Sequence, residues 1–216
     1  MKTKQERSEI FKSFQANIKK KDSFEKGKQD LLTLRADFSL AYNHIFSVLD
    51  EEDFYKMPLS KDKTVTYYLY HTLRIEDIIS NSLIADKEQL FFSQGFDISL
   101  KSPIITTGNE LSREEAAEFS RKLDIGQLKN YIDAVMANTS EIIRNMDFET
   151  SKTKVSAEKR AQLAASGVVS ASPYAFWLVD YWCKKTYAGL MLVPLSRHHM
   201  MHLDGGCARI INKIKK

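Results

Sequence analysis

The chain has 216 residues, of which 43% are hydrophobic and 28% charged. This composition predicts one domain over residues 1–216 with a core of its own, and it excludes a disordered chain. A membrane-spanning chain is excluded as well, because the longest apolar run, Tyr187 to Leu195, is much shorter than the ~20 residues that a spanning helix needs.

The net charge of +4 is concentrated at the two ends of the chain. Residues 1–35 contain ten basic and five acidic side chains, a net charge of +5, and residues 203–216 carry +3. Residues 36–202 are therefore mildly acidic, at about −4. Basic helical ends usually form solvated surface, and no aromatic-basic motif accompanies them, so we do not expect a nucleic-acid partner.

Eight glycines and four prolines are few for this length, which favours long helices over strands and turns. An apolar stripe at Ile10, Phe11, Phe14 and Ile18 predicts a basic helix within residues 1–22. The second helix is predicted by apolar residues that recur in steps of three and four, the seam of a helical bundle. These residues are Leu31, Leu34, Phe38, Ala41, Ile45 and Val48.

The charged segment 50–63 is predicted to be a loop, because it also contains Pro58. A third helix is expected to start near Asp62 or Thr64, since either can act as an N-cap, and to run to about Ala85.

Residues 93–111 contain two glycines and a proline and have no regular period, so we expect a long loop with a short extended piece at 104–106. Long loops in compact domains are often functional. Ser112 and Glu115 form a capping box, which predicts a short helix through Lys122.

A second bundle seam predicts the next long helix, through Leu128, Ile132, Val135, Thr139, Ile142 and Met146. Residues 149–171 are small and polar, with a weak helix expected around 157–165. Ser172 followed by Pro173 is typical of a helix start and predicts a helix to about Tyr187.

The last helix is predicted over 196–214, after the interruptions at Gly189 and Pro194. The Gly205-Gly206 pair inside it indicates a kink or a close approach by a neighbouring segment. Because no segment alternates as a strand does, the pattern predicts an all-α fold, an antiparallel four-helix bundle with additional short helices.

Two of the five histidines, His198 and His202, are one helical turn apart and share a face, so both imidazoles can reach one metal ion. His199 lies about 100° around the helix and is not expected to bind that ion. A zinc peptidase needs glutamate directly after the first histidine of the pair. Because His199 occupies that position, we do not expect a zinc peptidase.

His71 shares the inward face of the third helix with Ile75, Ile78 and Ile79. A histidine in such a place is hydrogen-bonded, neutral or metal-bound, because an unpartnered buried polar group is costly. On its own, His71 is interpreted as a core histidine whose hydrogen bonds are made within the protein. Together with the pair on another helix it becomes a candidate third ligand, and three neutral ligands leave an open position for water or a substrate anion.

The segments Tyr70–Asp77 (YHTLRIED) and Arg197–His202 (RHHMMH) resemble the DinB-like superfamily, also called the YfiT-like metal-dependent hydrolases. The resemblance implies a four-helix bundle with a divalent metal, nickel or zinc, held by His71, His198 and His202. It also implies a small-molecule substrate and a homodimer. Characterised relatives include transferases that use a low-molecular-weight thiol: bacillithiol, mycothiol or glutathione. The basic N-terminal helix departs from the simplest members.

We therefore expect a DinB-like metal-binding protein, a thiol S-transferase or a hydrolase. No general acid or base can be named from the sequence, so a non-catalytic metal- or ligand-binding module of a stress response remains the alternative. The stripe of the first helix and the aromatic segment Phe176–Trp182 offer more apolar surface than four helices need, which also favours a homodimer. Trp177, Tyr181 and Trp182 are interpreted as core or interface residues.

Two cysteines, Cys183 and Cys207, are too few and too distant for a disulfide framework or a thiolate zinc site. The chain is charged from Lys2 onward and shows no apolar segment typical of a signal peptide. A cytoplasmic protein is the expectation, with no membrane partner.

Overall fold

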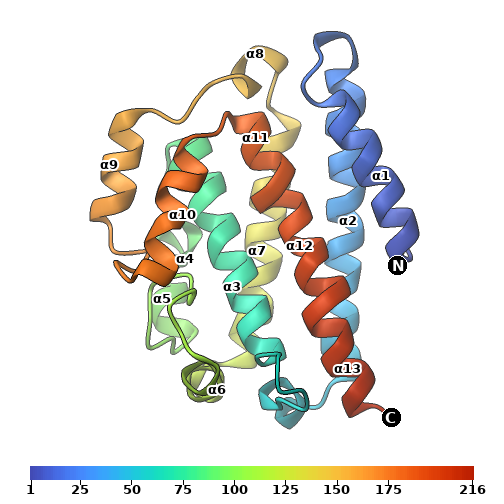
Figure 1. The fold of residues 1–216 in the computed structure, drawn as a ribbon, viewed down its shortest axis with the longest axis vertical. Coiled ribbons are helices and arrows are strands. Elements are labelled where there is room, and N and C mark those ends of the chain that lie inside the picture. Colours follow the sequence, from blue (N-terminus) through green and yellow to red (C-terminus); the bar gives the residue numbers. More distant parts are fainter.

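Four long helical segments lie side by side along the long axis of the computed structural model, which describes all residues from Met1 to Lys216 (Figure 1). They are α2 (Phe24–Val48), α3 (Val65–Asp77) with its π-helical continuation η3 (Ile78–Ala85), α7 (Ile125–Arg144), and a last continuous segment, Tyr187–Ile214. Outside the helices the single β pairing is an isolated bridge between Lys154 and Thr186. The predicted all-α fold is confirmed.

Shorter helices fill the connections and cover the bundle. They are α1 (Lys4–Asn17), α4 (Leu90–Ser93), α5 (Phe96–Ser99), α6 (Arg113–Lys122), α8 (Phe148–Ser151), α9 (Ala157–Ala165) and α10 (Pro173–Cys183). Two 3₁₀ turns, η1 (Lys21–Ser23) and η2 (Glu51–Tyr55), complete the helical elements.

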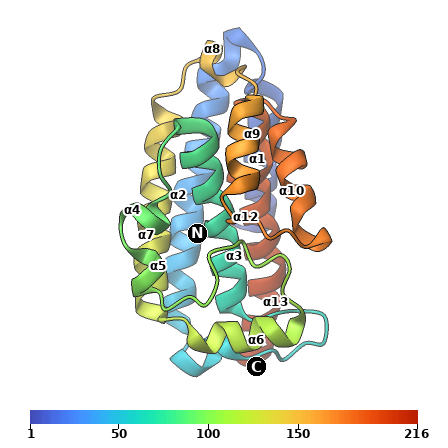
Figure 2. The same cartoon turned by 90° about the vertical axis from the view of Figure 1, so that its left-hand side faces the viewer.

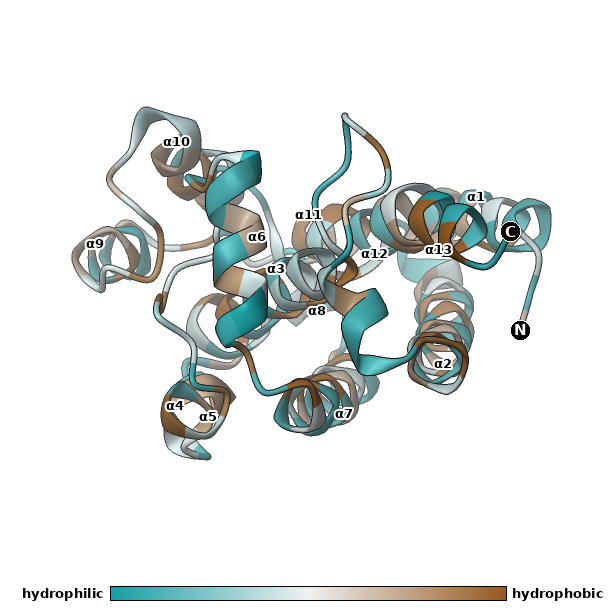
Figure 3. Ribbon diagram, turned by 90° about the horizontal axis from the view of Figure 1, so that it is seen from below, coloured by the Kyte–Doolittle hydropathy of each residue, from teal (hydrophilic) through white to brown (hydrophobic).

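The direction of the four long helices follows from one long connection. In Figure 1, α2 and the last segment run downward, whereas α3 and α7 both run upward. The chain between α3 and α7 returns along the outside through α4 and α5, and α6 crosses the lower end (Figure 2; seen end-on in Figure 3). Two helices in each direction, with a crossover connection, is a known arrangement of four-helix bundles.

The predicted N-caps explain where several helices begin. The Thr64 side chain accepts a hydrogen bond from the Tyr67 backbone N–H, and Ser112 forms its capping box at the start of α6. Asp62, the other candidate cap of α3, instead binds Arg209 at 2.6 Å. The sequence expectation for α3 is thus resolved in favour of Thr64.

The last helical segment begins earlier than predicted. It starts at Tyr187, capped by Thr186, and continues through Pro194 to Ile214. Pro194 is tolerated because it lies in a π-helical stretch, η4 (Val193–Arg197), where the regular hydrogen-bond ladder is already altered. Conversely, α10 ends at Cys183 rather than at Tyr187.

The connection predicted as a long loop differs in two details. Helix α5 forms within it, and residues 105 and 106 form a bend in place of the short extended piece expected at 104–106. The expected weak helix at 157–165 is present as α9.

Helix α1 packs along α2, and its apolar stripe is buried against the bundle, with Phe14 and Ile18 fully inaccessible. The Arg7 guanidinium lies between two carboxylates, 2.6 Å from Asp37 on α2 and in contact with Asp204 on the last segment. The apolar stripe of α1 is therefore covered by contacts within the chain. It supplies no surplus surface for a dimer, contrary to the argument from sequence.

None of the helices combines the length and the apolar character that crossing a bilayer requires.

Candidate metal centre

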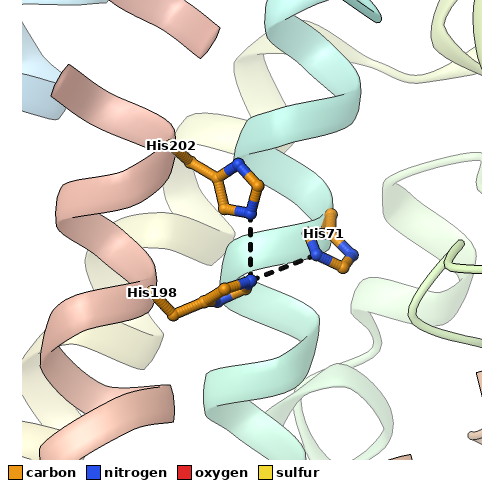
Figure 4. Close-up of side chains that lie close together, drawn as sticks. All are labelled: His71, His198 and His202. Carbon is orange, nitrogen blue, oxygen red and sulfur yellow. Dashed lines mark hydrogen bonds between the residues drawn. The ribbon is translucent and has the colours of Figure 1, made fainter. Parts of the chain in front are cut away.

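The three predicted histidines meet between α3 and the last helical segment (Figure 4). The Nε2 atom of His198 lies 3.2 Å from Nε2 of His71 and 3.0 Å from Nε2 of His202. One ligand atom from each residue lies within 4.8 Å of the other two. His71 is buried, and the other two are half-buried.

A regular turn of helix sets the spacing of His198 and His202. The backbone N–H of His202 donates to the carbonyl of His198, as in an α-helix, so the two rings lie one above the other. This turn, α12 (His198–Met201), is flanked by η4 and by a second π-helical stretch, η5 (His202–Cys207). Such π-helical bulges occur frequently at functional sites.

A glycine allows the last segment to approach α3 beside His202. A Cβ atom at Gly206 would lie 2.5 Å from the Tyr68 ring, whereas at Gly205 it would meet nothing closer than 3.5 Å. The Tyr68 ring in turn lies 5.0 Å from the His202 ring. The neighbour that approaches the glycine pair is thus the Tyr68 side chain. It leaves no room for a Cβ atom at Gly206, so only Gly206 is needed for the close approach.

His71 is held in one orientation by the loop after α5. Its Nδ1 lies 2.9 Å from the carbonyl oxygen of Thr107, and its ring stacks on Tyr67 with centroids 5.4 Å apart. A carbonyl only accepts hydrogen bonds, so Nδ1 of His71 carries the proton. The Nε2 lone pair therefore faces His198 and His202, an arrangement common among metal-binding histidines.

One face of α3 fixes this loop. Four side chains spaced as one helical face donate to successive backbone carbonyls, with Tyr67 binding Gly108 at 3.1 Å and Arg74 binding Ile105 at 2.7 Å. Tyr70 donates to the carbonyls of Ile104 and Thr106, and His71 to that of Thr107. The spacing is visible in the sequence, but its partners are 30 or more residues away.

All three imidazoles are neutral near pH 7. Burial lowers the pKa of His71 to about 4, and burial together with the charge of His71 lowers that of His202 to about 3. The pKa of His198 falls well below its ordinary value, again mainly through burial. Neutral imidazoles are the form that binds metals.

Two of the three separations between ligand atoms fit a divalent ion. For metal–nitrogen bonds of about 2.0–2.1 Å, two ligand atoms lie about 3.3 Å apart in a tetrahedral shell and about 2.9 Å apart in an octahedral one. The two measured separations, 3.0 and 3.2 Å, lie between these values. In addition, Nδ1 of His198 is buried without a hydrogen-bond partner. With the protons of His198 and His202 on Nδ1, all three Nε2 atoms would offer lone pairs to the space between them.

His199 points away from this centre, into the core, as its helical position predicted. Its Nδ1 lies 2.7 Å from the Tyr42 hydroxyl, its Nε2 lies 2.5 Å from Glu76, and its ring stacks on Phe38. Burial raises the pKa of Glu76, but the charges of Arg35 and His199 and their hydrogen bonds outweigh burial and lower it to about 2. This fully buried cluster joins α2, α3 and the last segment directly behind the three histidines.

The acidic residues Glu76, Asp77 and Asp180 do not contact the three imidazoles. Glu76 binds Arg35 and His199, and Asp77 binds Tyr131 and the backbone of α4. Asp180 pairs with Arg160 on the surface. The orienting group that the structure does show, the Thr107 carbonyl, is a backbone atom and leaves no signature in the sequence.

A cavity of about 360 Å³ opens beside His71 and His198. Its far wall is formed by α10 through Trp177, Tyr181 and Trp182, which were interpreted from sequence as core or interface residues. Only Trp182 is buried, whereas Trp177 is 52% exposed. A surface hollow of about 490 Å³ around Asp124 contains no histidine.

Comparisons with known proteins support the fold. No protein-family model matches the chain, and no curated protein matches it either. Among solved structures, a conserved protein from Enterococcus faecalis is similar, with a TM-score of 0.62 and 15% identity over 87% of this chain and 97% of that one. At this identity the similarity extends to the helical fold alone.

Proposed function

We propose that this chain is a metal-dependent enzyme that acts on a small molecule, with zinc or nickel held by Nε2 of His71, His198 and His202. The observation that carries the proposal is the convergence of these three atoms, with the lone pair of His71 fixed toward the others by the Thr107 carbonyl. The DinB-like resemblance of the same residues agrees with a thiol S-transferase or a hydrolase.

The side chains around the centre have definable roles in such an enzyme. The loop carbonyl holds the His71 ring. The buried Glu76–His199 contact joins the last helical segment to α3 and stabilises the fold around the centre. The aromatic wall of the cavity offers apolar surface to a small molecule. When bound, a divalent ion would supply a Lewis acid and lower the pKa of a thiol or water in the cavity.

One observation favours a second candidate, a non-catalytic module that binds a metal or a small ligand. No aspartate or glutamate lines the cavity, so no carboxylate is placed there as a general acid or base. An assay for transferase activity distinguishes the two candidates. Glutathione or bacillithiol is added to the zinc-loaded protein together with a chromogenic electrophile, and turnover is measured. Turnover that is lost in His202→Ala supports the enzyme, whereas a loaded protein without turnover favours the module.

Metal analysis of protein purified without a histidine tag tests the site itself. We expect about one zinc or nickel ion per chain in the wild type and little metal in His202→Ala. The matched control is His44→Ala, which removes an exposed histidine outside the centre. The proposal fails if the wild type binds no metal after incubation with zinc or nickel, or if all three proteins bind equally.

A further inference from the structure

The cavity beside the histidines has an unbalanced charge. Arg197 lines it as the single charged side chain, the other polar groups come from Asn109, Tyr181 and the two imidazoles, and no acidic residue contributes. The Arg197 guanidinium is exposed and makes no ion pair or hydrogen bond with another side chain of the protein. A cation that faces a largely apolar cavity without a counter-charge favours an anionic ligand.

The opposite wall offers flat apolar surface. Trp177 and Tyr181 are 52% and 36% exposed, and their rings meet edge to face with centroids 5.7 Å apart. Pro194 and Met201 continue this surface toward Arg197. Aromatic side chains bind rings through such offset and edge-to-face contacts.

We propose that the cavity binds small anionic molecules with an aromatic body, the acidic group against Arg197 and the ring against Trp177 and Tyr181. This inference deepens the proposed function by naming the substrate class. Three neutral imidazoles would leave the charge of a bound ion uncompensated, which strengthens the preference for an anion. Arg197 creates the same preference without the ion.

The neighbouring groove extends the positive potential. It runs along α1, shares Arg197 and Met201 with the cavity, and contains Lys4 and Lys12, neither of which is in an ion pair. Its acidic residue, Asp204, is paired with Arg7, and its Arg209 with Asp62. Since Lys12 lies outside the cavity, it provides a control for general electrostatic attraction. Lys12→Gln removes a charge that lies in the groove alone, whereas Arg197→Gln removes the charge that the cavity and the groove share.

Tryptophan fluorescence reports binding directly, because both tryptophans of the chain, Trp177 and Trp182, line the cavity. The probes are 4-phenylbutyrate, the neutral 4-phenylbutanamide, and butyrate, titrated into chelator-treated and zinc-loaded protein. We expect the aromatic acid to bind about tenfold more tightly than its amide, a difference of about 1.4 kcal/mol, and more tightly than butyrate. Arg197→Gln should remove the preference for the acid, and Lys12→Gln should keep it.

The inference is overturned by equal binding of acid and amide by the wild type, by a preference for the acid that survives Arg197→Gln, or by an equal loss of that preference in Lys12→Gln. Butyrate binding as tightly as phenylbutyrate, or no binding of any probe, would also overturn it. The metal proposal is tested separately in the same samples. Zinc that binds without a preference for the acid contradicts only the substrate class, and a preference without zinc binding contradicts only the metal centre.

Discussion

His199→Ala and His202→Ala should have opposite effects, although the two residues lie three positions apart on the same helical segment. His199 is fully buried among Tyr42, Glu76 and Phe38, whereas His202 lies at the candidate metal centre. We expect His199→Ala to lower the free energy of unfolding strongly and to spare metal affinity in the folded fraction. His202→Ala should lose the metal and retain most of the stability.

The magnitude follows from the contacts of His199. Its removal leaves the Tyr42 hydroxyl buried without the partner at 2.7 Å, whereas Glu76 keeps the bidentate contact with Arg35. One unsatisfied buried hydroxyl costs about 1–3 kcal/mol, and the lost stack on Phe38 leaves a cavity that adds about 1–2 kcal/mol. The total of about 2–5 kcal/mol is a large part of the 5–15 kcal/mol typical of a domain.

Urea denaturation of the metal-free proteins measures the stability difference, and zinc titration of the folded proteins measures the affinity. His44→Ala serves as the exposed-histidine control in both assays. The reasoning is refuted if His199→Ala unfolds within about 1 kcal/mol of the wild type, or if the two variants lose zinc affinity to the same extent.

Three further predictions concern pH, packing and assembly. Because burial lowers the pKa values of His71 and His202 to about 4 and about 3, the unfolded chain binds more protons below pH ~6.5. As the pH falls from about 6 to about 4, the free energy of unfolding of the metal-free protein should therefore decrease by up to about 1.4 kcal/mol per histidine for each pH unit. Urea midpoints measured over this range should decrease less steeply in His71→Ala. Gly206→Ala should displace the Tyr68 ring, lower the free energy of unfolding by about 1–3 kcal/mol and weaken zinc binding, whereas Gly205→Ala should have none of these effects. Equal effects of the two substitutions in calorimetry would contradict this prediction. A homodimer would now have to use the exposed aromatic face of α10, and sedimentation that shows a monomer at all micromolar concentrations would exclude it.

The long helices and the histidine cluster could be predicted because both depend on local spacing. The seams with steps of three and four face the core in α2 and α7, and Thr64 and Ser112 cap the helices that they were expected to cap. His198 and His202 needed only the geometry of one helical turn.

The supporting structure could not be predicted, because it depends on pairs distant in sequence. The Thr107 carbonyl that orients His71 is 36 positions away, and Arg7 finds its partners at Asp37 and Asp204, 30 and 197 positions away. Because these partners cannot be identified from the sequence, the apolar stripe of α1 was interpreted as surface available for a dimer. The π-helical stretch that carries Pro194 inside a helix likewise arises from packing rather than from local preference.

The place of the last helical segment has a consequence for synthesis of the protein. Its contacts reach back over most of the chain, from His198 to His71, from His199 to Tyr42, and from Asp204 to Arg7. Chains emerge from the ribosome N-terminus first, at about 5–20 residues per second. Until the segment Tyr187–Ile214 has emerged, α2 and α3 have no partner for the faces that it covers. We therefore expect a nascent chain halted before Tyr187 to be protease-sensitive and to need a chaperone, and the core to close only after this segment has been made.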